Sequence, residues 1–185
     1  ILILVTSVMN VFERELKTRI LQAIPHASIQ GNIHKMEVDG IRESLMLNAE
    51  VIGAAPYIET QGLLSSGTYL KGIYIFGVDT RYEKNVSTIE NHFIEGSLDS
   101  LEDNDYNLVI GDILAIQLGL RVGDSVNILV PETVLGLAGI LPRTKKFKIT
   151  GIFSLGAPEI DQSYVYLKMD KASKLLRTGE YVHGI

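Results

Sequence analysis

The sequence predicts an α+β fold in which helices cover one face of a mixed sheet. Three patterns support this: an amphipathic helix over residues 7–21, alternating strand and helix patterns over residues 27–79, and short strand patterns over residues 107–167. The composition agrees with it, because a chain of 185 residues that is 46% hydrophobic and 21% charged is long enough and apolar enough to bury a core.

The first part of the chain alternates helix and strand patterns. Residues 7–21 place apolar side chains on one helix face, at Met9, Phe12, Leu16 and Ile20. Residues 27–33 alternate as a half-buried strand after this helix ends. A second helix is expected from about Ile41 to Ala49. Residues 51–66 and 69–79 then predict two strands that form a hairpin around Ser66 and Gly67.

Residues 80–105 differ from their neighbours because they are polar and acidic, and they predict a domain boundary or an insertion. Residues 107–130 follow as a strand, a short helix and a second strand. In this helix we expect Asp112 as the N-cap and Gly119 as the residue just beyond the C-terminus. Such short strands are typical of a small barrel or sandwich.

The end of the chain predicts a strand over residues 164–167 and a helix over residues 169–177, which Asp170 is expected to cap. We find no internal repeat of fixed period and no low-complexity tract. These elements therefore predict one domain of average size or two small ones.

The connection V-L-G-L-A-G-I-L-P-R-T-K-K, residues 134–146, is unusually apolar for a segment between two strands. Connections normally run over the surface and are polar, so apolar side chains there are unfavourable unless they are covered. Two explanations remain open. Leu135 and Ile140 either pack beneath the connection as core, or a partner covers the apolar side chains.

The motifs that would indicate catalysis or a cofactor are missing from the sequence. Gly62 and Gly67 have the spacing of a phosphate loop, but Thr68 stands where that loop needs lysine. The histidines lack the spacing of a metal site, and the formal charge of −5 without a basic cluster argues against nucleic acid. We therefore predict a non-catalytic binding domain that has no cofactor and no metal.

The first residues, I-L-I-L-V at 1–5, are strongly apolar but far shorter than the roughly 20 residues that span a bilayer. They predict either the end of a transmembrane helix or a buried edge strand. Both interpretations are open on the sequence pattern alone.

Three blocks of sequence resemble a known family of permeases. They are V-T-S-V-M-N-V-F-E-R-E-L (5–16), G-D-I-L-A-I-Q-L-G-L-R-V-G-D-S-V (111–126) and P-R-T-K-K-F-K-I-T-G-I-F-S-L-G (142–156), the last followed by D-Q-S-Y-V-Y (161–166). Together they are similar to the lipoprotein-releasing system permeases of bacterial ABC transporters, the LolC/LolE family. The second block also resembles the wider group of MacB-type permeases.

The resemblance implies a MacB-like periplasmic core domain with a Porter subdomain of β-α-β units, an inserted Sabre subdomain and a protruding β-hairpin called the hook. In these terms residues 1–22 are the end of the first transmembrane segment and a stalk helix. The Porter subdomain is formed by two segments, residues 23–80 and residues 147–185. The Sabre-like insertion is residues 81–130, and the hook is residues 131–146.

The resemblance also implies a function. A permease of this family sits in the bacterial inner membrane and is expected to hand lipoproteins to the periplasmic carrier LolA, with this fragment in the periplasm. The ATPase subunit LolD hydrolyses ATP, so this chain is expected to be no enzyme itself, and a second permease subunit completes the transporter. The alternative is the mechanotransmission domain of a MacB-like efflux or signalling permease.

The family's partner-binding residues carry over to two groups of positions in this chain. The hook tip maps to Leu137, Ala138, Gly139, Ile140, Leu141 and Pro142. A polar pad beside the tip maps to Asn127, Arg143, Thr144 and Lys145. Asn127 departs from the pattern, because the family is expected to have arginine there.

Overall fold

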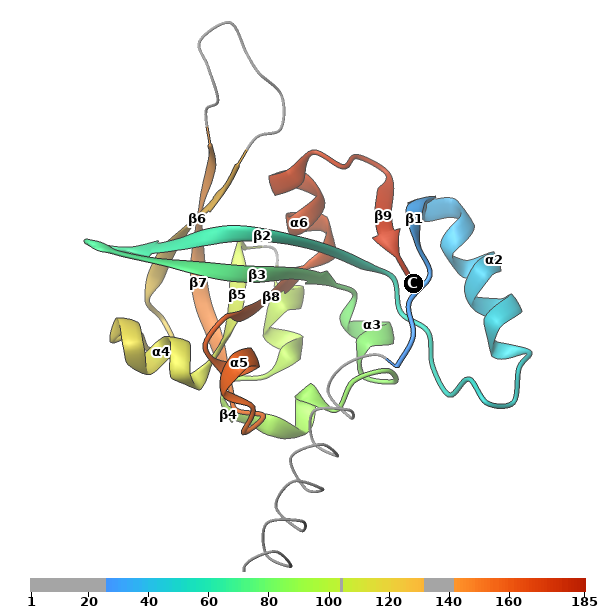
Figure 1. Cartoon of the computed structure of the whole chain (residues 1–185), viewed down its shortest axis with the longest axis horizontal. Coiled ribbons are helices and arrows are strands. Elements are labelled where there is room, and N and C mark those ends of the chain that lie inside the picture. Colours follow the sequence, from blue (N-terminus) through green and yellow to red (C-terminus); the bar gives the residue numbers. More distant parts are fainter. Residues whose placement is uncertain (1–25, 104, 132–141) are drawn as a thin grey trace, which may run out of the picture.

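Six strands close into a barrel at the centre of the protein (Figure 1). The computed structural model describes residues 26–103, 105–131 and 142–185. Around the barrel the order is β2 (Tyr57–Ser66), β3 (Tyr69–Val78), β8 (Tyr164–Lys168), β5 (Asn107–Gly111), β7 (Arg143–Phe153) and β6 (Ser125–Val130), which returns to β2. The β3–β8 and β5–β7 pairs are parallel and the other pairs are antiparallel, which confirms the mixed sheet and the α+β class.

The barrel is filled by apolar side chains from alternate positions of its strands. On β6 the even-numbered residues are buried while Ser125 and Asn127 are exposed, as expected when successive side chains point to opposite faces. The interior cluster includes Leu64, Ile75, Ile110, Ile128, Phe147 and Val165. Helices α4 (Asp112–Leu118) and α6 (Met169–Leu176) add Leu114, Ala172 and Leu175 to the same cluster.

A second apolar cluster lies on the outer face of one side of the barrel. Val78, Val109, Phe153 and Tyr166 of β3, β5, β7 and β8 meet side chains from the polar segment of residues 80–105 and from α5 (Pro158–Asp161). That segment forms α3 (Thr80–Glu83), η1 (Ile89–His92), β4 (Phe93–Glu95) and η2 (Leu98–Glu102). Although polar overall, it buries Ile89, Leu98 and Leu101 against the barrel.

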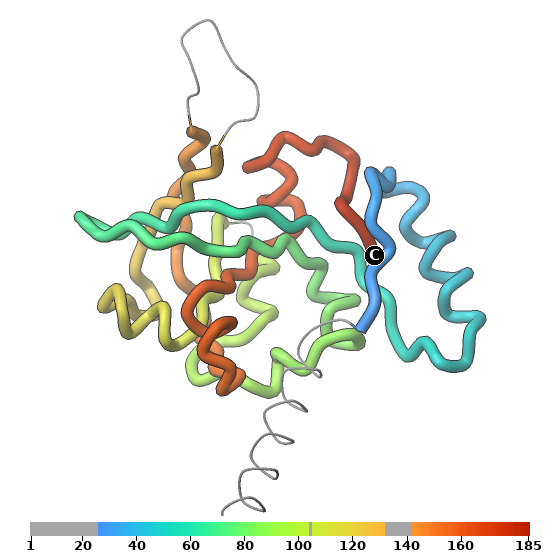
Figure 2. Tube along the Cα trace, viewed as in Figure 1, coloured from blue at the N-terminus to red at the C-terminus, as the bar shows by residue number. Residues whose placement is uncertain are grey.

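The two ends of the described chain meet at the edge of the sheet, as Figure 2 also shows. Strand β1 (Gln30–His34) pairs with β9 (Tyr181–Gly184), and the backbones of Ile29 and Ile185 exchange two hydrogen bonds. Helix α2 (Lys35–Met46) follows β1 and buries only Val38. This end of the sheet is therefore a peripheral layer beside the barrel.

Several expected boundaries were wrong. The second helix starts at Lys35 instead of near Ile41, and β2 starts at Tyr57 instead of at residue 51. Gly119 does end α4 in the left-handed conformation, with φ 63°, as predicted. Asp112 and Asp170 are not N-caps, because Gly111 and Lys168 occupy those positions and the acidic residues lie inside their helices.

The predicted helix over residues 7–21 lies outside the described residues. The division into Porter, Sabre and hook segments stays a prediction. Strands β5 and β6, which fall in the segment assigned to the Sabre insertion, pair with barrel strands from the segments before and after it. Any insertion in this chain therefore shares hydrogen-bonded sheet with the segments that flank it.

Candidate functional site

The outer faces of β6, of the first half of β7 and of the middle of β2 are open to solvent. Asn127, Thr144 and Lys146 are exposed on these strands, while their sequence neighbours Val126, Ile128 and Phe147 are buried inside the barrel. The opposite side of the barrel buries its outer side chains under the second cluster. Among the described residues, this strip of the barrel wall is therefore accessible to a partner.

Side chains on this strip form rows across three strands. Leu63 pairs with Leu129, which pairs with Thr144, and Ser65 pairs with Asn127, which pairs with Lys146. Directly paired residues share a face and have Cβ atoms roughly 5 Å apart, so each row is continuous. We call the set the outer patch: Leu63, Ser65, Asn127, Leu129, Thr144 and Lys146.

The outer patch has the chemistry of a binding surface. Leu63 is 39% exposed and Leu129 is half-buried, so two leucines form its apolar centre. An amide, two hydroxyls and the ammonium of Lys146 surround them. An apolar centre with a polar rim is common in protein interfaces, and a rim cation speeds association with an acidic partner.

The barrel wall divides the predicted pad into two halves. Asn127 and Thr144 lie on the outer face, inside the outer patch. Arg143 and Lys145 lie on the same side of β7 as the buried Phe147, because side chains two residues apart share a face. The structure therefore brings together only two of the four predicted pad residues.

The inward pair makes contacts at the rim of the barrel. The Nη1 atom of Arg143 donates to the carbonyl oxygen of Leu176, 2.7 Å away, at the end of α6. Lys145 places its Nζ atom 4.3 Å from the ring centre of Tyr106, which in turn packs edge-on against Phe147. Arg143 thus stabilises a helix C-terminus, where orphan carbonyls need donors.

The predicted hook tip adjoins the outer patch in sequence. Leu137, Ala138, Gly139, Ile140 and Leu141 lie outside the described residues. Pro142 is described, and it is exposed immediately before β7. The last pair of the β6–β7 ladder is Val130 with Arg143, so residues 131–142 connect two adjacent antiparallel strands.

Sequence reasoning missed four members of the outer patch, namely Leu63, Ser65, Leu129 and Lys146. The alternation through T-K-K-F over residues 144–147 contained a usable signal, because a buried Phe147 places Lys146 on the outer face. Leu63 is far away in sequence, and only its pairing with Leu129 brings it to this surface.

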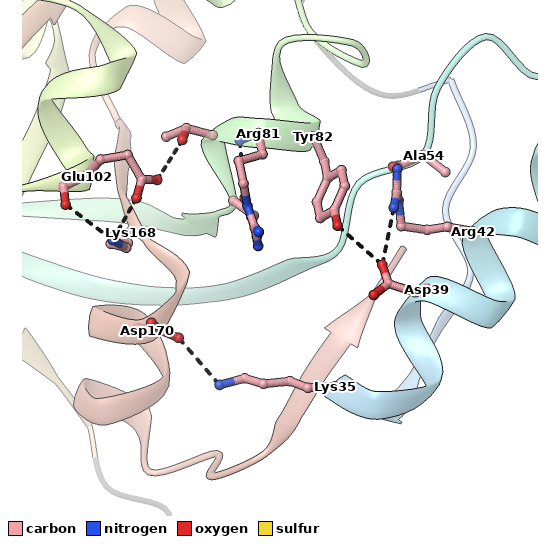
Figure 3. Close-up of polar contacts among 11 residues, drawn as sticks. Lys35, Asp39, Arg42, Ala54, Arg81, Tyr82, Glu102, Lys168 and Asp170 are labelled. Atoms are coloured by element: carbon pink, nitrogen blue, oxygen red, sulfur yellow. Dashed lines mark hydrogen bonds and ion pairs between the residues drawn. The ribbon is translucent and has the colours of Figure 1, made fainter.

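A polar cleft of about 420 Å³ lies on another side of the protein, between α2 and the helices α3 and α6 (Figure 3). Its charged side chains are paired: Lys168 with Glu102 at 2.6 Å, Arg81 with Asp79 at 2.6 Å, and Lys35 with Asp170 at 3.5 Å. These contacts hold neighbouring elements to one another, and they account for the charges without a ligand.

The pairs also shift two acid–base equilibria in the cleft. Burial works to raise the pKa of Glu102, but hydrogen bonds from Lys168 and Thr80 outweigh it and lower the pKa. Burial likewise works to raise the pKa of Asp79, and hydrogen bonds from Arg81 lower it overall. Both carboxylates are therefore held ionised as partners of cations.

In the described ranges, residues 26–103, 105–131 and 142–185, no group of three or more histidine, aspartate or glutamate side chains is arranged to hold a metal ion. Nor do the helices in those ranges include one that is both long and apolar enough to cross a bilayer.

Comparison with known proteins identifies relatives along the whole chain. A family model described as the MacB-like periplasmic core domain matches residues 1–185. The lipoprotein-releasing system transmembrane protein LolC of Xylella fastidiosa is 34% identical over 178 residues, which cover 96% of this chain and 43% of that protein. LolC of Neisseria meningitidis is 31% identical, covering 100% and 45%, and LolE of Haemophilus influenzae is 30% identical, covering 95% and 43%. This chain spans less than half the length of these relatives.

Solved structures show a similar fold. The periplasmic region of MacB from Actinobacillus actinomycetemcomitans matches with a TM-score of 0.54 and 14% identity, over 84% of this chain and 64% of that chain. The extracellular domain of the noncanonic ABC-type transporter YknZ from Gram-positive bacteria matches with a TM-score of 0.56 and 9% identity, over 83% and 71%. At these identities the likeness concerns the fold alone.

Proposed function

We propose a function from the premise that this chain belongs to the MacB-like periplasmic core domain family. It is the periplasmic domain of an inner-membrane ABC permease that releases lipoproteins and hands them to a soluble periplasmic carrier of the LolA kind. The names of its LolC and LolE relatives support the lipoprotein substrate. ATP hydrolysis belongs to a separate ATPase subunit, LolD, and a second permease subunit completes the transporter.

The observation that carries this proposal is the position of the outer patch. The patch is an accessible apolar and basic surface on β2, β6 and β7, and the last two of these strands also anchor the apolar connection of residues 131–142. A partner that covers the connection also meets Lys146, Thr144 and Asn127 at its base. One docking event then uses both surfaces, which is the arrangement expected of a carrier-binding site.

The two surfaces have separate tasks in this proposal. The connection, with Leu137, Ile140 and Leu141, enters an apolar cavity of the carrier, because each CH₂ removed from water contributes about 0.8 kcal/mol. Asn127, Thr144 and Lys146 bind the carrier's polar rim. Lys145 stays exposed on the other side of the β7 wall, where it attracts an acidic carrier without sharing the patch.

The proposal predicts that Leu137→Asp weakens carrier binding at least tenfold. A charge placed in an apolar cavity loses its hydration without gaining a partner, which costs more than the lost apolar contact alone. Isothermal titration calorimetry of the 185-residue chain with LolA from the same organism measures the change. Leu47→Asp is the matched control, because Leu47 is 88% exposed at the far end of α2 and should have no effect.

A second prediction concerns the patch itself. Lys146→Glu is expected to lower the association rate for an acidic carrier about tenfold at low salt, and the difference should shrink at high salt because screening weakens rim electrostatics. Surface plasmon resonance measures the rate. The control is Lys174→Glu, which makes the same charge change on the exposed face of α6.

If the wild-type chain does not bind the carrier, the proposed function is wrong and the mechanotransmission alternative is favoured. Normal binding by both Leu137→Asp and Lys146→Glu would instead place the carrier on another surface.

A further inference from the structure

The β2–β3 hairpin extends past the end of its neighbour β8. Strand β8 pairs with β3 only from Tyr74 to Val78, so Tyr69–Ile73 has β2 on one side and no other described strand on the other. Figure 1 shows the turn of this hairpin projecting beyond the rest of the barrel. Five residues of strand therefore present an open edge.

Two features of the hairpin show which backbone N–H and C=O groups face the open edge. The hairpin has a two-residue turn at Gly67 and Thr68, so Ser66 and Tyr69 bond each other and every second residue after Tyr69 bonds β2. In addition, the amide of Tyr74 donates to Ser163 on the other side. By alternation, Leu70 and Gly72 direct their N–H and C=O groups away from β2, to the open edge.

The edge lacks most of the features that normally protect such strands. Natural edges are blunted by proline, bulges or charged side chains. This one carries a single lysine, Lys71, and it exposes large side chains: Tyr69 is 61% exposed, Leu70 59% and Tyr74 44%. Nothing lies within 4 Å of the position where a side chain on Gly72 would begin. The backbone of another chain can thus approach closely.

We propose that this edge accepts, as an added strand, an extended peptide segment in which apolar residues alternate with polar ones and an acidic residue faces Lys71. Among the described strands none pairs with the N–H and C=O groups of Leu70 and Gly72 on this edge, so these four groups can bond the backbone of an added strand. Apolar residues of the segment would lie beside Leu70 and Tyr74, and an acidic residue is favoured opposite Lys71.

A second copy of this chain fits the edge less well than an extended segment does. Antiparallel self-pairing through Leu70 and Gly72 places Lys71 directly opposite Lys71, and like charges in that position repel. A register centred on Leu70 places Gly72 opposite Thr68, which lies in the turn. A register centred on Gly72 places Leu70 opposite Tyr74, whose amide already donates to Ser163. Only an independent segment engages all four groups without one of these conflicts.

The test uses the 185-residue chain and a fluorescent peptide of about six residues with the pattern Val-Glu-Val-Thr-Val-Thr, the length of an ordinary strand. Fluorescence anisotropy should show saturable binding. Gly72→Pro should weaken it at least tenfold, because proline removes an edge N–H and its ring blocks approach. Gly72→Ala retains the N–H in open space and is the matched control. Both variants should melt like the wild type, since the amide of Gly72 points away from β2.

A second measurement shows where the peptide binds. Amide hydrogen exchange at Leu70 and Gly72 should slow at least tenfold when the peptide binds, while exchange at the barrel residue Leu64 should not change.

Equal binding of the peptide by Gly72→Pro and by the wild type, or unchanged exchange at both edge amides, would overturn the proposal. So would sedimentation showing a dimer that Gly72→Pro dissociates, because a second copy would then occupy the edge. Carrier binding should be normal in Gly72→Pro, so failure here is distinguishable from failure of the proposed function.

Discussion

Replacing Glu83 with glutamine is expected to stabilise the protein by about 3 kcal/mol above pH 8 and by much less at pH 4. Glu83 ends α3, and its residue surface is only 8% exposed. Burial disfavours the charged carboxylate and raises the pKa from 4.5 to about 7. The phenol of Tyr166 is affected as well, because burial first and the charge of Glu83 second raise the pKa of this tyrosine.

The sign of the effect follows from proton binding. The folded protein keeps a proton on Glu83 up to a pKa of about 7, whereas the unfolded chain releases it near 4.5. Stability from this group is therefore fully present below pH 4.5 and is lost as the pH rises through 7. Glutamine is neutral throughout, so the variant should lack this loss.

Urea denaturation at pH 4, 6 and 8.5 measures the difference in the free energy of unfolding. Glu43→Gln is the matched control, because Glu43 is exposed on α2 and should leave the pH profile unchanged. Parallel pH profiles for Glu83→Gln and the wild type would show that the Glu83 carboxyl is as well solvated in the fold as in the unfolded chain.

Asp161→Ala is expected to destabilise the protein by about 3 kcal/mol and to lower the melting temperature by roughly 10 °C. Asp161 is 1% exposed. Its two carboxylate oxygens accept hydrogen bonds from the amides of Leu155 at 2.9 Å and Ala157 at 3.0 Å. Alanine leaves both amides without their acceptor in the interior, and each such group costs about 1–3 kcal/mol.

Thermal unfolding followed by circular dichroism tests this prediction. Asp161→Asn keeps one acceptor oxygen and should lose roughly half as much stability. Glu159→Ala serves as the control from the same short helix, because Glu159 is exposed. A melting temperature for Asp161→Ala within a degree of the control would mean that water or a neighbouring group replaces the carboxylate.

The β2–β3 hairpin was the region of the fold that the sequence predicted best. Alternating apolar residues on both sides of Gly67 indicate two paired strands, and the structure confirms them as Tyr57–Ser66 and Tyr69–Val78. Gly67 has φ 57°, which a tight turn requires and a side chain would disfavour. Local backbone chemistry is sufficient here because the two strands are adjacent in sequence.

The start of helix α2 was placed poorly because the apolar stripe of this helix is short. It buries only Val38, and polar contacts attach it to its neighbours. Arg42 donates to the carbonyl of Ala54 at 2.8 Å and lies 3.6 Å from the ring centre of Tyr82. The apolar stripe of Val38, Ile41 and Leu45 starts three residues after the helix does, so it does not mark where the helix begins.

The sequence predicted only part of the candidate site correctly. Asn127 and Thr144 were predicted and do share the outer patch, whereas Arg143 and Lys145 lie on the opposite face of β7. The resemblance selected consecutive residues, but a strand sends neighbours to opposite sides. The alternation around Phe147 is a local pattern that is sufficient to assign Thr144 to one face and Lys145 to the other.

The sequence by itself determined the α+β class, the β2–β3 hairpin, the left-handed end of α4 at Gly119 and the apolar character of residues 134–146. Each depends on residues close together in the chain. Only the tertiary structure decided that the barrel closes through β2 and β6, which brings Leu63 beside Leu129 and leaves Leu70 and Gly72 on an open edge. Those features depend on which strands far apart in sequence hydrogen-bond to each other and on where β8 ends beside β3. Pairing between strands that are distant in sequence produces no local sequence pattern that could predict it.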